Sequence, residues 1–166
     1  TASVRFGSYM ELCSSKTNVI SLFKALEWDN YGLITYNNQL IYYFVEVLFG
    51  GRRLEPNLKV EGRNFTAIEH SVIRNVSDLI LENLSNAFEQ VTIASFFMDK
   101  IENNPKFVMI ARPEDIAIVL RLKLEMGKRS GSLDLVIPYP TIEPVKKLLA
   151  KSYIGERGSR DPVWLN

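Results

Sequence analysis

The chain has 166 residues, of which 46% are hydrophobic, enough to bury a core in one domain or in two fused halves. Its 20 basic and 19 acidic residues give a net charge of +1, which argues against nucleic acid or an anionic membrane surface as a partner, because both are bound through a basic surplus. The longest apolar run, residues 40–49, has about half the length that a membrane span needs and contains Glu46.

The residue types of nucleophilic and metal chemistry are few. Cys13 is the only cysteine, so an internal disulfide is impossible and a reducing compartment is predicted. His70 is the only histidine, which argues against a zinc site or a catalytic triad, and we interpret it as a partly exposed surface residue. Gly50-Gly51 and the segment GKRSGS at 127–132 lack the spacing of phosphate-binding loops. The sequence therefore predicts no metal and no cofactor.

The first part of the chain predicts strands and one helix. Residues 2–6 indicate a short strand, and the β-branched and aromatic residues of 31–37 indicate another. Residues 18–28 fit either a short helix or an apolar strand, and the pattern leaves both open. Residues 38–49 are apolar on nearly every side, which is typical of a helix covered by neighbours.

That helix has a start signal and a stop signal. Asn37 or Asn38 can cap its first turn, and Gly50 can adopt the left-handed conformation that ends a helix. A polar and charged connector follows before the next helix begins.

The clearest local signal comes next. Thr66 and Glu69 fit a capping box, in which each side chain satisfies an amide that has no partner within the helix. This predicts a helix over about 67–88, roughly 33 Å long. Apolar residues at three- and four-residue steps predict its buried stripe: Ile68, Val72, Val76, Leu79, Ile80, Leu84 and Phe88.

Strand-like segments, separated by turn residues, follow at 90–98, 106–111, 116–125 and 132–137. Pro138 and Pro140 end the last of them, and Thr141 can cap a final helix that reaches about Ala150.

The two parts of the chain resemble each other weakly. GLITYNNQLIYYFVEVLFG (32–50) and SLDLVIPYPTIEPVKKLLA (132–150) are each a strand, a polar break and an apolar helix. ASVRF (2–6) has a counterpart in ASFFM (94–98). Two such halves sharing one sheet predict an α/β fold, a three-layer sandwich with a pseudo-two-fold axis.

Several strings carry a resemblance to a known family. LFGG (48–51), KVEGRNFTAIE (59–69), IPYPTIEPVKKLL (137–149) and the closing RDP-x-W (160–164) resemble the middle domain of the flagellar motor switch protein FliM family. The resemblance implies the CheC-like fold, a pseudo-symmetric α/β/α sandwich with a mixed sheet and long flanking helices.

The resemblance also implies how the chain is divided. Residues 1–152 would be the middle domain, with a first half at 1–50, a docking loop at 50–62 and a second half at 63–152. Residues 153–166 would be a linker toward a FliN-like domain. Because residues 1–6 already read as a strand without a start methionine, we expect a fragment of a longer protein. The family's long first helix, its N-terminal CheY-binding peptide and its C-terminal domain would lie outside it.

The resemblance assigns a role to the connector. In this family a GGxG loop docks onto the middle domain of FliG, and Gly50 and Gly51 match its first two glycines, whereas Arg53 stands in place of the last. Glycine suits such a contact because it permits positive φ and close approach of another backbone. The expected docking residues are Gly50, Gly51, Arg52, Arg53, Leu54 and Pro56.

Some relatives, CheC among them, are phosphatases of phosphorylated CheY. Their three active-site positions correspond here to Ser71, Asn75 and Asp78, so Glu has become Asn and Asn has become Asp. The phosphatases orient the attacking water with the Asn amide, whereas a carboxylate at Asp78 would repel the phosphoryl group. Lys100 stands where those enzymes carry a proline.

The resemblance therefore implies a non-enzymatic part of the rotor switch complex, the C-ring of the flagellar basal body. Expected partners are the FliG middle domain, neighbouring FliM copies, phosphorylated CheY, and FliN or FliY through the absent C-terminal domain, with no nucleic acid. The implied location is cytoplasmic, peripheral at the inner membrane. Two alternatives stay open: a CheC-like phosphatase of phosphorylated CheY, and a ligand-binding α/β module unrelated to motility.

Overall fold

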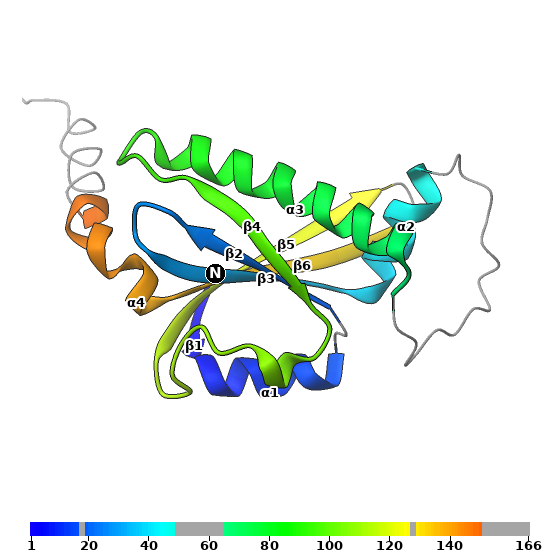
Figure 1. Cartoon of the computed structure of the whole chain (residues 1–166), viewed down its shortest axis with the longest axis horizontal. Helices are drawn as coiled ribbons and strands as arrows, with labels where there is room; N and C mark the ends of the chain where they lie inside the picture. Colours follow the sequence, from blue (N-terminus) through cyan, green and yellow to red (C-terminus); the bar gives the residue numbers. More distant parts are fainter. Residues whose placement is uncertain (17–18, 49–64, 127–128, 151–166) are drawn as a thin grey trace, which may run out of the picture.

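The structure, a computed structural model, describes residues 1–16, 19–48, 65–126 and 129–150. A six-stranded sheet lies at its centre, with the strand order β1-β5-β6-β3-β2-β4 (Figure 1). The strands are β1 (Ala2–Arg5), β2 (Ile20–Ala25), β3 (Asn30–Tyr36), β4 (Phe96–Glu102), β5 (Ile116–Met126) and β6 (Arg129–Pro138).

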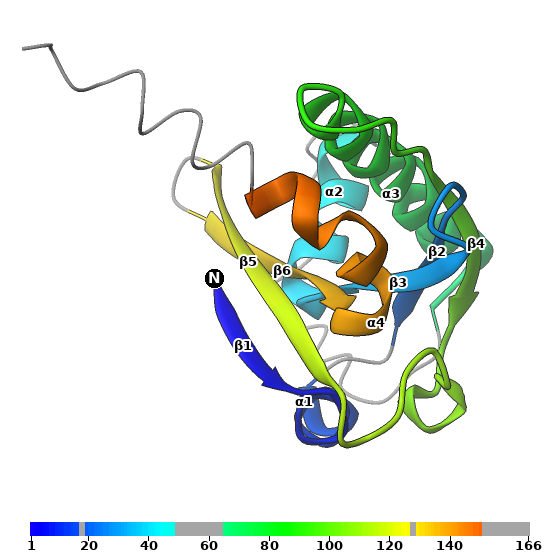
Figure 2. The ribbon, with the colours of Figure 1, turned by 90° about the vertical axis from the view of Figure 1, so that its left-hand side faces the viewer.

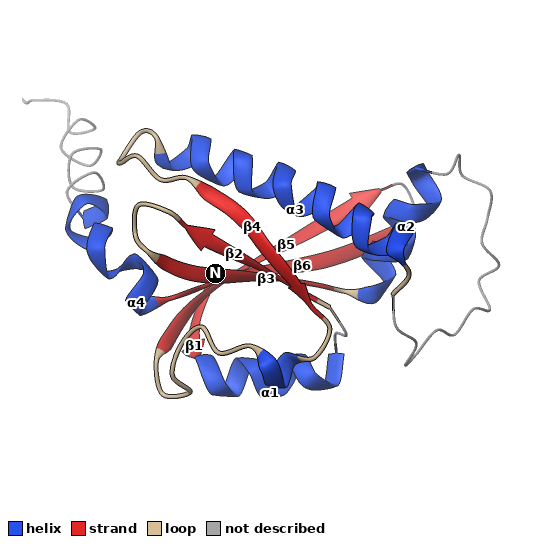
Figure 3. Ribbon diagram, in the orientation of Figure 1, coloured by secondary structure: helices blue, strands red, loops and turns tan. Residues whose placement is uncertain are grey.

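Helices cover both faces of the sheet, which confirms the three-layer α/β sandwich (Figures 1 and 3). Helix α1 (Phe6–Lys16) and the short 3₁₀ turn η1 (Pro105–Phe107) lie on one face. The other face carries α2 (Asn38–Leu48), α3 (Ala67–Phe88), α4 (Tyr139–Ile142) and the 3₁₀ turn η2 (Glu143–Val145). None of the helices in the described part of the chain is long and apolar enough to cross a membrane.

The sheet has the symmetry that the sequence repeat predicts. Exchanging β1 with β4, β2 with β5 and β3 with β6 reverses the strand order and leaves it otherwise unchanged. The strand-helix pairs β3–α2 and β6–α4 correspond to the two similar segments of the sequence. The family resemblance implied a mixed sheet within this sandwich. Every pairing between described strands is antiparallel.

Side chains alternate between two apolar clusters, one on each face. On β3, Leu33 packs with Phe6 and Tyr9 beneath α1, whereas Ile34 packs with residues of α2 and α3 on the opposite face. Strand β2 is likewise buried on both faces, so its apolar run has no alternation that would separate a strand from a helix. Within the segment 18–28, left open in the sequence, the strand β2 therefore runs over Ile20–Ala25.

Helix α3 has the predicted bounds and the predicted capping box. The Thr66 amide donates to the Glu69 carboxylate at 2.6 Å, and the Glu69 amide donates to Thr66 Oγ1 at 3.4 Å. The predicted stripe is partly wrong, because Ile68 and Leu79 are 53% and 59% exposed. The side chains buried instead include Glu69, Ile73, Ser77 and Leu81.

The stripe was predicted wrongly because two polar side chains, Ser77 on α3 and Tyr36 on β3, are buried and hydrogen-bonded to each other. Ser77 Oγ lies 2.6 Å from the Tyr36 hydroxyl and donates to Ile73 O at 2.7 Å. Such bonds allow a serine to replace an apolar residue on the buried face. A count of apolar residues alone cannot detect this.

Three other expectations differ from the structure. Residues 106–111 are not a strand, because Asn104 Oδ1 accepts from the Lys106 amide and starts the turn η1. Residues 90–95 precede β4, which begins only at Phe96. Thr141 is not a cap, since α4 begins at Tyr139 and the Thr141 hydroxyl donates to Tyr31 O at 2.7 Å.

Helix α2 starts as expected but is less covered than its sequence predicts. Asn37 is the cap, since its Oδ1 accepts from the Gln39 amide at 2.8 Å. Leu40 and Ile41 are buried, whereas Val47 and Leu48 in the last turn are 54% and 64% exposed. The end of α2 therefore presents an apolar surface at the point where the predicted docking loop begins.

Candidate functional site

The predicted docking loop, with Gly50, Gly51, Arg52, Arg53, Leu54 and Pro56, lies outside the described residues. Its two flanks are described. Phe65 is buried, and its ring centroid lies 6.0 Å from that of Tyr42 on α2. This aromatic contact holds the residue that follows the connector against the helix that precedes it.

The three positions that correspond to phosphatase residues lie together on the exposed side of α3. Ser71, Asn75 and Asp78 all face solvent. The Ser71 hydroxyl donates to Ala67 O one turn earlier, at 3.0 Å, a common local bond of serine in helices. The structure thus places these side chains on one surface. Asn75 supplies an amide at the position of the phosphatase Glu, and Asp78 supplies a carboxylate at the position of the phosphatase Asn.

A depression of about 470 Å³ lies beside them, between α3 and β4. None of its six lining residues is acidic, and all but Ile101 are basic or neutral polar: His70, Ser71, Arg74, Asn75, Lys100 and Ile101. His70 Nε2 lies 3.2 Å from Asn103 Oδ1, and Lys100 Nζ lies 3.9 Å from Glu102. This surface can attract an anionic group.

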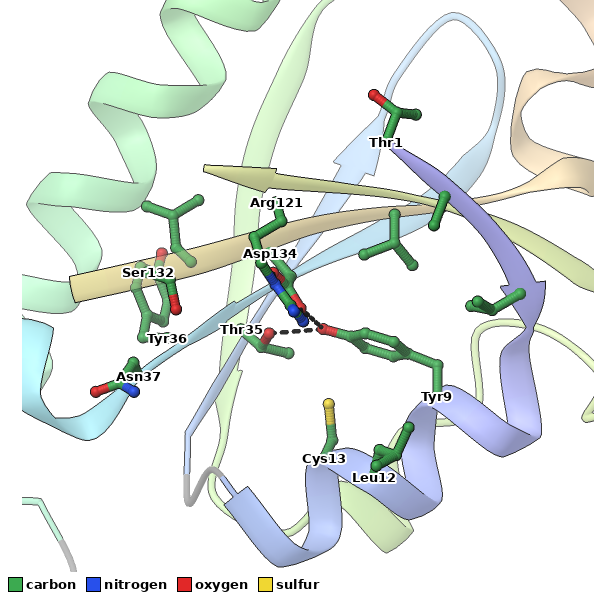
Figure 4. Close-up of a pocket in the computed structure, with 14 residues that line it drawn as sticks. Thr1, Tyr9, Leu12, Cys13, Thr35, Tyr36, Asn37, Arg121, Ser132 and Asp134 are labelled. Atoms are coloured by element: carbon green, nitrogen blue, oxygen red, sulfur yellow. Dashed lines mark hydrogen bonds and ion pairs between the residues drawn. The ribbon is translucent and has the colours of Figure 1, made fainter. Parts of the chain in front are cut away.

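The best-defined cavity lies on the opposite face, beneath α1 (Figure 4), with a volume of about 390 Å³. A polar network forms its floor. The Tyr9 hydroxyl lies 2.8 Å from Thr35 Oγ1 and donates to Asp134 Oδ2 at 3.0 Å. Arg121 Nε and Nη2 each donate to the Asp134 carboxylate at 2.7 Å.

The surroundings of this cluster favour the protonated forms of Tyr9, Cys13 and Arg121. Burial raises the pKa of the Tyr9 phenol and of the Cys13 thiol, so both stay protonated. The hydrogen bonds to Asp134 raise the pKa of Arg121 further above its already high value. A protonated, buried thiol is a poor nucleophile, so Cys13 is poorly suited to covalent catalysis.

Sequence reasoning did not identify this cluster. Tyr9 and Asp134 are 125 positions apart, and Arg121 faces Asp134 only through the register of β5 and β6. One signal was present, because Asp134 interrupts the apolar run of residues 133–137, and a buried carboxylate needs partners. Across the described ranges no group of three or more His, Cys, Asp or Glu side chains could hold a metal ion.

An antiparallel sheet built from two interchangeable halves, with helices on both faces, is of the CheC-like class. Two solved structures share this fold. The crystal structure of the FliM middle domain (51–229) from Vibrio alginolyticus matches with a TM-score of 0.74 and 24% identity, over 89% of this chain and 80% of that chain. A chain of the FliG-FliM complex from H. pylori matches with a TM-score of 0.75 and 19% identity, over 87% of this chain and 77% of that chain.

The sequence comparisons agree with this fold. The family model described as flagellar motor switch protein FliM matches residues 1–154. The flagellar motor switch protein FliM of Caulobacter vibrioides is 40% identical over 163 residues, which are 98% of this chain. The chain therefore belongs to the FliM family. It spans 43% of the length of that relative.

Proposed function

We propose that this chain is a module of the flagellar rotor switch that binds FliG, packs beside copies of itself and transmits the phosphorylated-CheY signal. The observation that carries the proposal is the FliM family match over residues 1–154. The fold match to a chain of a FliG-FliM complex supports FliG as the partner. In this role the protein works at the cytoplasmic face of the flagellar basal body, with FliN or FliY held through a C-terminal domain.

The FliG contact is assigned to Gly50, Gly51, Arg52, Arg53, Leu54 and Pro56. Two features of the described structure support this placement. Val47 and Leu48, at the end of α2 next to this loop, leave apolar area exposed. The contact between Phe65 and Tyr42 anchors the other end of the connector. An exposed apolar helix end that precedes a glycine-containing loop in the sequence suits a contact in which the partner approaches the backbone closely.

Direction control requires two arrangements of the assembled copies. Phosphorylated CheY can shift the balance between them only by binding one arrangement more tightly than the other. Each contact between copies can be weak, because a ring presents many of them at once. The proposed module therefore works through differences in binding, and no chemical step is assigned to it.

The exposed side of α3 that carries the three phosphatase positions argues against phosphatase activity. Ser71, Asn75 and Asp78 are exposed together, but the position that should carry an amide carries the Asp78 carboxylate. A negative charge there opposes the approach of an acyl phosphate. The nearby basic side chains Arg74 and Lys100 can attract an anion, but they do not replace the missing amide.

Two assays on the same sample test the proposal. We expect the immobilised chain to retain the FliG middle domain, and phosphorylated CheY to release phosphate at its spontaneous rate in the presence of the chain. Retention without phosphate release would support the switch module. Accelerated phosphate release would favour the phosphatase, and the absence of both activities would favour a ligand-binding module.

A further inference from the structure

The cavity beneath α1 has no part in the proposed function. Its volume of about 390 Å³ falls within the range of small-molecule pockets. It lies between α1, β1 and the sheet surface formed by β3, β5 and β6 (Figure 4). Its walls combine an apolar side with a polar floor, and these two parts determine which ligand it suits.

The floor does not favour a cationic ligand. Asp134 is only 7% exposed, and both of its carboxylate oxygens already accept hydrogen bonds. The Tyr9 hydroxyl is engaged with both Asp134 and Thr35. A positive group entering the cavity would find these acceptors already occupied.

Arg121 carries the charge in this cavity that remains available to a ligand. Its side chain is 67% exposed, and Asp134 is its only hydrogen-bond partner among the residues that the structure describes. A guanidinium has five N–H donors, and the bonds to Asp134 use one on Nε and one on Nη2, which leaves three. Asp134 fixes the plane of the Arg121 guanidinium. The N–H groups on the free edge of the guanidinium are therefore held in position to donate hydrogen bonds to a carboxylate.

The apolar side of the cavity comes from α1 and the sheet edge. Leu12 lines the cavity and is 56% exposed, so it offers apolar area that a ligand in the cavity could cover. Figure 4 shows its side chain extending from α1 toward the cavity. Val4 on β1 and Val119 on β5 also line the cavity, so an apolar group placed there could contact side chains from three elements.

We propose that this cavity binds a small amphipathic organic acid. Its carboxylate pairs with the free N–H groups of Arg121, and its apolar body packs between Leu12 and the valines of β1 and β5. The site is separate from the connector assigned to FliG and does not depend on that assignment.

The test is a titration of the ¹⁵N-labelled 166-residue chain with 4-phenylbutyrate, followed by two-dimensional NMR. We expect saturable shifts at the amides of Leu12, Cys13, Val119 and Arg121. For a ligand of this size the dissociation constant should be on the order of 1 mM. The neutral amide 4-phenylbutyramide should bind at least about fivefold more weakly, because it cannot form the charged pair.

Matched variants separate the apolar wall from a general loss of surface hydrophobicity. Leu12→Ser should weaken binding at least about fivefold, whereas Leu79→Ser removes an equally exposed leucine from α3 and should leave the affinity unchanged. The double variant Arg121→Gln/Asp134→Asn replaces the ion pair without leaving a buried charge alone, and it should abolish the preference for acid over amide.

Three results would overturn the proposal. The first is equal affinity for the acid and the amide, and the second is equal affinity of the wild-type chain and a folded Leu12→Ser variant. The third is a set of saturable shifts confined to residues outside the cavity. The dispersion of each variant's spectrum shows that it is folded, so a loss of binding is not mistaken for a loss of structure.

Discussion

Two tyrosine hydroxyls are buried on opposite faces of the sheet. Tyr9 reaches from α1 to Asp134 and Thr35, and Tyr36 on β3 reaches up to Ser77 on α3. Burial raises the pKa of both phenols above the ordinary value of 10.0. Both therefore keep their protons in the folded state at a pH where the unfolded chain releases them.

This difference predicts a loss of stability in alkaline solution. Below pH 10.0 both states hold the phenolic protons, so their contribution is constant. Above it only the unfolded state releases them, and the unfolding free energy should fall by about 1.4 kcal/mol per pH unit for each buried phenol. Urea unfolding at about pH 9 and about pH 11 measures this slope.

Tyr9→Phe is the control for that slope. The variant loses its hydrogen bonds and should be less stable at every pH, but its stability should fall less steeply above pH 10.0 than that of the wild type. If the two proteins had equal slopes, the Tyr9 hydroxyl would not be buried in the way the structure shows.

At the scale of elements, α3 shows what the sequence determines and what it leaves out. Its start depends on Thr66 and Glu69, which lie within four residues of each other, and the predicted capping box was confirmed. The side that it buries depends on distant partners, because Ser77 finds Tyr36 and Ser21 on the strands below. Local signals were therefore enough to predict where the helix starts, whereas the side that it buries depends on contacts formed only in the packed fold.

Leucines of α3 test that orientation. Leu81 is 1% exposed and Leu79 is 59% exposed, although the sequence pattern assigned Leu79 to the buried stripe. Leu81→Ala should lower the unfolding free energy by about 2–5 kcal/mol, whereas Leu79→Ala should change it by less than about 0.5 kcal/mol. Thermal or urea unfolding of both variants gives the comparison. Similar losses for both would mean that α3 is rotated about its axis.

The candidate sites differ in how far the sequence could reach them. The docking loop was assigned through a family resemblance at Gly50 and Gly51, and it stays a prediction because those residues lie outside the described part of the structure. The cavity beneath α1 had no local signature, since its floor joins Tyr9, Thr35, Arg121 and Asp134 from four elements. A cluster of this kind exists only after the strands have paired in register.

At the scale of the whole molecule, each half lends an edge strand to the other. β1 belongs to the first half but pairs with β5, and β4 belongs to the second half but pairs with β2. Figure 2 shows these two strands at opposite edges of the sheet. Neither half completes its part of the sheet alone, so the two should unfold as one cooperative unit. In such a unit, a change caused by binding at one surface can be transmitted to another surface.

Calorimetric titration of the chain with the FliG middle domain tests the central claim most directly, with Gly51→Asp and Gly127→Asp measured beside the wild type. Gly127→Asp places the same change in the segment between β5 and β6, away from the assigned docking loop in the sequence. We predict a dissociation constant on the order of 1 μM for the wild type and for Gly127→Asp, and no measurable binding for Gly51→Asp. A folded wild type that does not bind, or a Gly51→Asp variant that binds equally well, would contradict the account.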